Sequence, residues 1–176
     1  MEKITKAVDL DQHKIVNDGC MITFSGIVIN LMHPDPETIL IEDIAHGLAN
    51  NCRWNGHSQK FWSVAQHCCM MYDKAPHNEK LSWLFHDAEE AYWGDIIKPL
   101  KNIIRESCPQ ITERMKQMRR LIYKKFKIYP QTMLCMIGDF ECLEWEFENI
   151  IKKENADFWL PERAEQEWLY RYFKSI

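Results

Sequence analysis

Apolar residues recur every three or four positions along most of the chain, the spacing that places side chains on one face of an α-helix. The apolar residues from Ile41 to Leu48 follow this spacing, and so do those of residues 110–127, whose opposite face is basic. The pattern predicts one long helix over residues 131–153. It also predicts a final helix over residues 161–173, which begins at Pro161, a favoured first-turn residue.

Two further helices in the middle of the chain carry start and stop signals. Ser63 is a candidate N-cap, and Gln66 three residues later completes the spacing of a capping box. Pro76 stops that helix, Asn78 is the candidate cap of the next one, and Gly94 is expected to end it. The buried face of this second helix is expected to contain Leu81, Leu84, Phe85, Ala88 and Tyr92.

Residues 21–30, with the sequence MITFSGIVIN, alternate apolar and small residues around Ser25 and Gly26, which predicts a short β-hairpin. With about six helices and this one hairpin, we expect an all-α fold. A chain of 176 residues fits one domain. We therefore expect a single domain over residues 21–176, preceded by an extension over residues 1–20 to which no function is assigned.

The composition narrows the classes of partner. The formal net charge is −4 and the pI is about 6.0, which argues against binding to the phosphate backbone of nucleic acids. The basic run KQMRRLIYKKFK, residues 116–127, could face nucleic acid, but a solvated helix face is the favoured interpretation. No stretch approaches the ~18 apolar residues of a membrane span, and the amino terminus lacks the apolar core of a signal peptide. The seven cysteines contain no CxxC pair. We therefore expect a cytoplasmic protein with reduced thiols and no membrane partner.

The segment LFHDAEEAYWGD, residues 84–95, combines ionisable and apolar residues in a way that an ordinary core helix would not. On a helix, His86 and Glu90 lie four residues apart and Asp87 and Glu90 lie three apart, so all three side chains can point to one side. Neutral imidazole and carboxylate groups are both good ligands of first-row divalent cations. The segment therefore indicates a metal site, and the alternative is a helix surface on which the acids are simply solvated.

His67 and Asp139 are candidates for the same site. His67 follows Ser63 in the preceding helix, where a lone histidine is more often a hydrogen-bonded core residue than a ligand. Asp139 is set among apolar residues of the long helix, and a buried, unpaired carboxylate is costly, so it needs a cation or several donors. A salt bridge would satisfy Asp139 as well. One metal ion bound by these two residues together with His86 and Asp87 would satisfy all four groups at once.

This ordered set of a histidine, a His-Asp pair and a later aspartate resembles the HD-domain phosphohydrolase superfamily. The resemblance extends to the segments CRWNGH…SVAQH, HDAEEAYWGDIIKPLK and GDFECLE, and covers about residues 21–150. Within the superfamily, the chain is similar to bacterial 5'-deoxynucleotidases. It is still more similar to small HD phosphohydrolases of phages and prophages, which include HD-type dATP triphosphohydrolases. The resemblance implies an HD-domain helical bundle and a hydrolase that acts on nucleotides.

The resemblance also implies a metal centre and a general base. The metal ligands would be His67, His86, Asp87 and Asp139. They would hold one divalent transition-metal ion, with Mn²⁺, Co²⁺, Fe²⁺, Ni²⁺ and Zn²⁺ all compatible with this ligand set and Mg²⁺ as an alternative activator. Glu90 matches the acid that orients or deprotonates the attacking water in the deoxynucleotidase-like branch.

Three further positions match residues that face the substrate in the family, and two more are candidates for contact with phosphate. Asp95 matches an acid that touches a sugar or leaving-group oxygen. Arg53 and Trp54 match a pair that contacts phosphate and packs on the sugar, which disfavours a 2'-hydroxyl. His57 and Lys98 could also reach phosphate, but His57 could instead hydrogen-bond its own loop and Lys98 could be solvated.

We therefore expect metal-dependent hydrolysis of the 5' phosphoester of (deoxy)nucleotides, with monophosphate and triphosphate substrates both open. One alternative is an HD phosphodiesterase, nuclease or alarmone hydrolase, although HD nucleases usually carry partner domains or long basic surfaces. Another is a non-catalytic, nucleotide-binding regulatory domain, although such domains tend to lose a ligand or the water-directing acid, and none is missing here. The expected partner is a small-molecule nucleotide rather than a nucleic acid. Family habit also implies a homo-oligomer, a dimer or a larger assembly.

Overall fold

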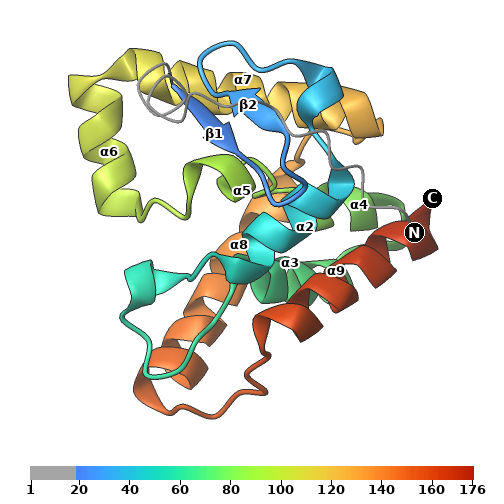
Figure 1. Cartoon of the computed structure of the whole chain (residues 1–176). Coiled ribbons are helices and arrows are strands. Elements are labelled where there is room, and N and C mark those ends of the chain that lie inside the picture. Colours follow the sequence, from blue (N-terminus) through green and yellow to red (C-terminus); the bar gives the residue numbers. More distant parts are fainter. Residues whose placement is uncertain (1–18) are drawn as a thin grey trace.

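The computed structural model describes residues 19–176, and within them the chain forms eight α-helices and one two-stranded sheet (Figure 1). The expected mostly helical fold with a short hairpin is thus confirmed, whereas residues 1–18 of the expected extension lie outside the described residues. The strands are β1 (Cys20–Ile22) and β2 (Val28–Asn30). The helices are α2 (Ile41–Asn50), α3 (Val64–Lys74), α4 (Lys80–Leu84), α5 (Glu90–Trp93), α6 (Lys98–Ser107), α7 (Pro109–Phe126), α8 (Met133–Glu146) and α9 (Pro161–Ser175). Short 3-10 turns, η1 (Pro36–Thr38), η2 (Trp54–Gly56) and η3 (His77–Glu79), and a π-helical segment, η4 (Phe147–Lys152), complete the order.

The hairpin lies where the sequence predicts it and is fastened to α2. Its strands pair antiparallel, with Cys20 opposite Asn30. In the connecting loop Gly26 has a φ of 83°, a conformation that glycine adopts without strain. The backbone N–H and the hydroxyl of Ser25 donate to the carboxylate of Asp43 in α2, at 2.7 and 2.8 Å. Two bonds to one carboxylate therefore hold the loop against the helix.

Helices α2, α3 and α9 pack on one another at the centre of the molecule (Figure 1). An aromatic cluster fills this region, in which the ring of Phe85 lies 5.0 Å from that of Trp168 and 5.6 Å from that of Phe126, between centroids. The ring of Tyr172 packs against all three. Burying a large apolar side chain contributes about 1.5–3 kcal/mol. Because Phe85 directly precedes His86, the cluster anchors the segment that carries the His-Asp pair.

The single helix predicted between Asn78 and Gly94 is interrupted, which corrects the sequence-based expectation. Residues 85–89 form turns between α4 and α5, in which the N–H of Ala88 donates to the carbonyl of Phe85 at 3.0 Å. Most side chains of this segment are buried, so tertiary contacts on several sides replace the one apolar face of a helix. Gly94 does end α5, with a φ of 77°.

Helix α6 adds a second correction, because no helix is predicted over residues 98–107. It buries no residue fully, and its sequence signals are Pro99 in the first turn and the helical spacing of Leu100, Ile103 and Ile104. The split of one predicted helix and the addition of α6 account for eight helices in the described residues where about six are expected. The predictions for α7 and α9 are confirmed within a few residues, whereas the helix predicted over residues 131–153 is α8 followed by the π-helical segment η4. None of the helices among residues 19–176 has both the length and the apolar composition needed to cross a membrane.

The capping box predicted at the start of α3 forms only in part. The hydroxyl of Ser63 accepts a hydrogen bond from the backbone N–H of Gln66 at 3.1 Å, as predicted. The side chain of Gln66 does not return to Ser63. Its amide donates to the carbonyl of Asp157 and accepts from the N–H of Trp159. Gln66 therefore ties the segment before α9 to the start of α3.

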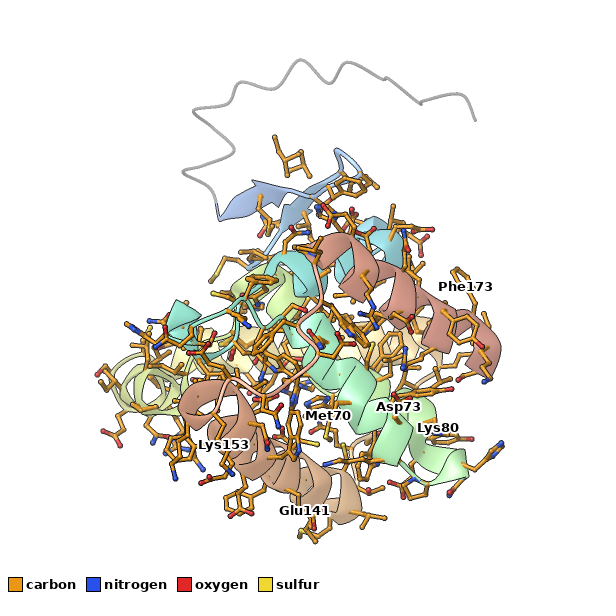
Figure 2. All side chains as sticks on the ribbon, turned by 90° about the horizontal axis from the view of Figure 1, so that it is seen from below. Met70, Asp73, Lys80, Glu141, Lys153 and Phe173 are labelled. Carbon is orange, nitrogen blue, oxygen red and sulfur yellow. The ribbon has the colours of Figure 1, made fainter. Side chains whose placement is uncertain are left out.

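Helix α8 is buried on one side only. Cys135 and Cys142 belong to a buried cluster that includes residues of α3, whereas Met136 and Phe140 are 59% and 57% exposed. Figure 2 shows Glu141 of this helix pointing away from the body of the molecule. The helix thus presents a partly apolar outer side to solvent while its inner side faces α3.

Candidate metal centre

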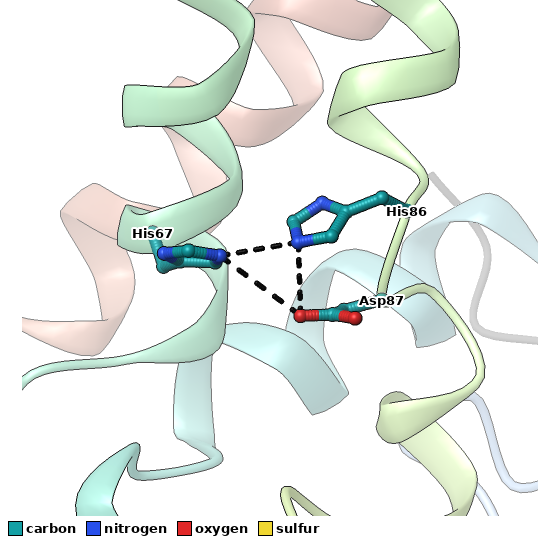
Figure 3. Close-up of side chains that lie close together, drawn as sticks. All are labelled: His67, His86 and Asp87. Carbon is teal, nitrogen blue, oxygen red and sulfur yellow. Dashed lines mark hydrogen bonds and ion pairs between the residues drawn. The ribbon is translucent and has the colours of Figure 1, made fainter. Parts of the chain in front are cut away.

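Two imidazole rings and two carboxylates meet at one point, although they come from three separate parts of the chain. His67 lies on α3, His86 and Asp87 lie in the turns between α4 and α5, and Asp139 lies on α8. The Nε2 atoms of His67 and His86 are 3.1 Å apart (Figure 3). Oδ2 of Asp87 lies 3.0 Å from the Nε2 of His86, and Oδ1 of Asp139 lies 3.2 Å from the Nε2 of His67. The structure therefore brings all four predicted ligands together, and the buried group of His67, His86 and Asp87 could hold a metal ion.

Hydrogen bonds behind the rings fix which nitrogen of each histidine faces the centre. Nδ1 of His86 lies 2.8 Å from the carbonyl oxygen of Trp83, which can only accept, so this Nδ1 donates. Nδ1 of His67 lies 2.7 Å from Oε1 of Glu146. Since a carboxylate also accepts, His67 donates there too. When it is neutral, each ring therefore has its lone pair on the Nε2 atom that points at the other predicted ligands, which is the tautomer that a metal ion needs.

Glu146 is a functional residue that the sequence-based expectation missed. It is fully buried, and besides His67 it accepts hydrogen bonds from Nε of Arg53 at 3.0 Å, Nε1 of Trp54 at 3.2 Å and Nε1 of Trp62 at 2.9 Å. Burial alone would raise the pKa of its carboxyl, but His67 and Arg53 outweigh burial and lower the pKa to about 2. Its position seven residues after Asp139 on the same helix, two turns further along one face, is the signal that could have found it.

The charges at the centre favour a cation. Burial would raise the pKa of the Asp139 carboxyl, but hydrogen bonds with His67 and His86 hold it well below its usual value. The pKa of Asp87 is also lowered, against burial, chiefly by His86. Burial would lower the pKa of His86, but Asp87 raises it well above its usual value. Two ionised carboxylates beside two imidazole rings are a donor set that suits a first-row divalent ion, which would displace the proton of His86.

The position of Asp139 differs from the expected buried one. Its side chain is 45% exposed, because the apolar residues Met136 and Phe140 that flank it in the sequence face solvent rather than the core. His67 and His86 close the opposite side of the centre, since both are almost completely buried. The centre is therefore exposed to solvent on the side of Asp139.

Glu90, the predicted general base, is buried beside the centre and is paired with a lysine that was not predicted. Its Oε1 accepts a hydrogen bond from Nζ of Lys101 in α6 at 2.7 Å, and its buried Oε2 has no hydrogen-bond partner among residues 19–176. Burial and the charge of Asp87 raise the pKa of Glu90 well above its usual value, while Lys101 opposes the shift. Lys101 was missed because α6 itself was not predicted.

Arg53 reaches Asp87, Trp54 reaches Glu146, and Asp95 lies near Arg53, while their expected contacts with a substrate stay a prediction. Arg53 is buried, and its Nη1 lies 3.8 Å from Oδ2 of Asp87. Burial would lower its pKa, but Glu146 and Asp87 outweigh burial and raise it. Trp54, which has a φ of 58°, points its indole N–H at Glu146. The pKa of Asp95 is raised by burial, with Arg53 opposing.

His57 and Lys98 are not brought into contact with the centre. Both side chains are exposed, and no hydrogen bond or ion pair within residues 19–176 joins either of them to the predicted ligands. His57 ends η2 through its backbone N–H, which donates to the carbonyl of Trp54 at 3.0 Å. Their expected contact with phosphate stays a prediction, and Lys101, one turn after Lys98, is the lysine that reaches an acidic group of the site.

Comparisons with known proteins find two similar proteins, and both are uncharacterized. No family model matches the chain. The uncharacterized protein YfdR of Escherichia coli (strain K12) is 35% identical over 108 residues, which cover 61% of this chain and 58% of that protein. The uncharacterized protein RCAP_rcc00048 of Rhodobacter capsulatus is 36% identical over 100 residues, 52% of this chain and 51% of that protein. The chain thus matches less than two thirds of the length of either relative.

Proposed function

We propose that the protein is a metal-dependent phosphohydrolase that acts on (deoxy)nucleotides and cleaves a 5' phosphoester. The observation that carries this proposal is the convergence of two imidazole Nε2 atoms with the carboxylates of Asp87 and Asp139, while Glu146 and the carbonyl of Trp83 hold both Nδ1 atoms. Ordinary core histidines would not need two carboxylates on one side of the rings and an acceptor on the other. A bound cation satisfies all these groups together.

His67, His86, Asp87 and Asp139 would hold the ion. When bound, a divalent ion would polarise a phosphoryl oxygen and lower the pKa of a coordinated water toward neutrality. The half-exposed side chain of Asp139 marks the side from which a phosphate group reaches the ligands. The buried side of the centre, behind His67 and His86, excludes water.

Glu90 takes the proton of the attacking water in the proposed reaction. A general base works best when its pKa lies near the working pH, and burial together with Asp87 raises the pKa of Glu90. Its unpaired Oε2 is the atom available to accept the proton. Lys101, hydrogen-bonded to Oε1, keeps the carboxylate oriented.

Arg53 is the proposed phosphate contact. Its Nε is committed to Glu146, while the terminal Nη1 faces Asp87 at 3.8 Å without a normal hydrogen bond. The guanidinium therefore has donors left for phosphate oxygens, and its orientation is already fixed by Glu146. Trp54 and Asp95 lie beside it and are the proposed contacts to the sugar or the leaving group.

Product analysis tests this proposal. Purified protein with Mn²⁺ or Co²⁺ is incubated with ribo- and deoxynucleoside mono- and triphosphates, and the products are separated by chromatography. We expect inorganic phosphate from deoxynucleoside monophosphates, or tripolyphosphate and a nucleoside from deoxynucleoside triphosphates. The His86→Ala variant, purified identically, controls for contaminating phosphatases. No product from any nucleotide of the panel, or equal product from this variant, would contradict the proposed function.

A further inference from the structure

A second concave site lies away from the metal centre, where α7 ends. The cavity has a volume of about 710 Å³ and is lined by residues of the last turns of α7 and of the loop that follows. Lys127, with a φ of 56°, ends the helix, and the N–H of Ile128 donates to the carbonyl of Tyr123 at 2.8 Å. This closing turn fixes the path of the loop. The volume falls in the ~300–1,000 Å³ range of small-molecule sites.

All the charged residues that line the cavity are cations. The lining includes Arg119, Arg120, Lys124 and Lys127 but no acidic residue. Arg119 is bound to Glu89, and Arg120 pairs with the exposed Glu113. Within residues 19–176, neither Lys124 nor Lys127 forms a side-chain ion pair or hydrogen bond, so two full charges remain uncompensated beside one concave surface. This concentration is unusual in a chain whose net charge is −4.

Two tyrosines line the cavity with their aromatic rings. Tyr123 is only 8% exposed and its hydroxyl is fully buried, so its ring and not its hydroxyl would meet an occupant of the cavity. Tyr129 is 82% exposed at the rim, where its ring can pack on a flat group.

The floor of the cavity is fixed by a network that reaches the His-Asp turn. Nε of Arg119 donates to Oε1 of Glu89 at 2.8 Å, and Nη1 donates to Gln131 at 3.3 Å. The amide of Gln131 donates to the carbonyl of His86 at 2.7 Å. An occupant of the cavity would therefore contact the two side chains that support the turn carrying Asp87.

We propose that this cavity binds a small phosphate-bearing molecule, with its phosphate between Lys124 and Lys127. The volume of the cavity and its two unpaired cations fit a small molecule better than a nucleic acid, which needs an extended basic surface. The proposal does not rest on the function proposed for the metal centre. It assigns a role to the basic run of residues 116–127, which the metal centre leaves unused.

A titration followed by NMR tests this second site. Pyrophosphate is the probe, and ¹⁵N-labelled protein freed of metal by EDTA and dialysis is titrated with it, which is practical for a chain of 21.1 kDa. We expect saturable shifts of the amides of residues 123–131. The double variant Lys124→Ala/Lys127→Ala should weaken binding at least about tenfold, because both charge-assisted contacts are lost. The matched control Lys116→Ala/Arg105→Ala removes two exposed cations outside the cavity and should bind as the wild type does.

Three results would overturn the proposal. The first is an absence of saturable shifts in residues 123–131. The second is equal weakening in both double variants, which would mean diffuse attraction to a basic surface. The third is a shift of these amide signals on addition of a duplex oligonucleotide, with no shift on addition of pyrophosphate. Because metal-free protein is used and the shifts locate the binding site, a failure of the proposed hydrolysis leaves this result unaffected.

Discussion

Glu146 accepts hydrogen bonds from four side chains although no part of it reaches solvent. A buried carboxylate is stable only when donors and a counter-charge surround it, and here Arg53 supplies the charge. The carboxylate in turn holds the ring of His67 with its Nε2 toward the other ligands. A residue that touches neither metal nor substrate thus sets the geometry of a ligand.

We expect Glu146→Gln to lower metal affinity by about 10–100-fold, as loss of such a supporting group typically does. The amide is neutral and holds the Nδ1 proton of His67 less strongly. The measurement is a calorimetric titration of metal-free protein with Mn²⁺, with circular dichroism to check the fold. Glu144→Gln, an exposed position on the same helix, is the matched control. Equal metal affinities in the two variants would show that Glu146 does not support metal binding.

Glu90→Gln tests the proposed base separately from the metal. The variant keeps the hydrogen bond to Lys101 but cannot accept a proton, so we expect turnover to fall by about 10²–10⁴-fold. Metal content, measured by elemental analysis, should stay at the wild-type level. A metal-loaded variant with full activity would show that another group, or none, takes the proton.

Residue type and spacing were enough to predict which four side chains come together, but not the residues that hold them in place. The side-chain types are ones that commonly bind metal ions, and their order along the chain matches that of the family which the sequence resembles. The four residues are His67, His86, Asp87 and Asp139. Lys101 could not be predicted, because it reaches Glu90 only through the way α6 turns back after Gly94. Contacts of this kind depend on the path of the chain between elements, which local sequence patterns do not specify.

At the scale of elements, the turns over residues 85–89 explain how one short segment serves three purposes. Phe85 packs into the aromatic core, His86 points to His67, and Glu89 pairs with Arg119 of α7. A regular helix cannot send neighbouring side chains in these directions and keep one buried face. Gly94 ends α5 as predicted, whereas Asn78, the predicted cap, lies inside η3 and does not cap α4.

The contact between α4 and α8 depends on Gly138. A Cβ atom added there would overlap the ring of Trp83, whose carbonyl holds His86. We expect Gly138→Ala to lower the free energy of unfolding by about 1–3 kcal/mol, as overpacking of a core does. Urea denaturation measures the change, with Ile137→Ala at the neighbouring exposed position as the control, where about 0.5 kcal/mol or less is expected. A Gly138→Ala variant as stable as that control would mean that Trp83 moves aside freely.

Glu79 joins the same two helices and makes their contact sensitive to acid. Hydrogen bonds from Nε1 of Trp83 at 2.9 Å and the hydroxyl of Thr132 at 2.7 Å lower the pKa of its carboxyl below the usual 4.5. A carboxyl with a lowered pKa in the folded state stabilises fully above its unfolded-state pKa, and this stabilisation is lost as the pH falls through the folded-state value.

We therefore expect the wild type to lose stability more steeply than Glu79→Gln as the pH falls below about 4.5. Urea denaturation at a series of pH values measures both slopes. Glu141→Gln, an exposed acid of α8, serves as the control and should follow the wild type. Parallel pH profiles for the wild type and Glu79→Gln would contradict a role for these bonds.

At the scale of the whole molecule, three parts of the chain converge at the candidate metal centre. They are α3, the turns between α4 and α5, and α8. These parts are separated along the chain and are brought together by the aromatic core on one side and by the cluster of α3 and α8 on the other. The helical class and the hairpin were predictable because each follows from a local period of apolar residues. The crossing of α8 over α3 was not, because it depends on the small residues at their contact rather than on any periodic signal.

The central proposal is that His67, His86, Asp87 and Asp139 together bind one divalent ion, and a calorimetric titration of metal-free protein with Co²⁺ tests it most directly. We predict one ion per chain, with binding abolished in the double variant His67→Ala/His86→Ala. His46→Ala, which removes an imidazole bound to Glu165 rather than to these residues, should bind as the wild type does. Stoichiometric binding that survives in the double variant, or no binding by the folded wild type, would contradict the proposal.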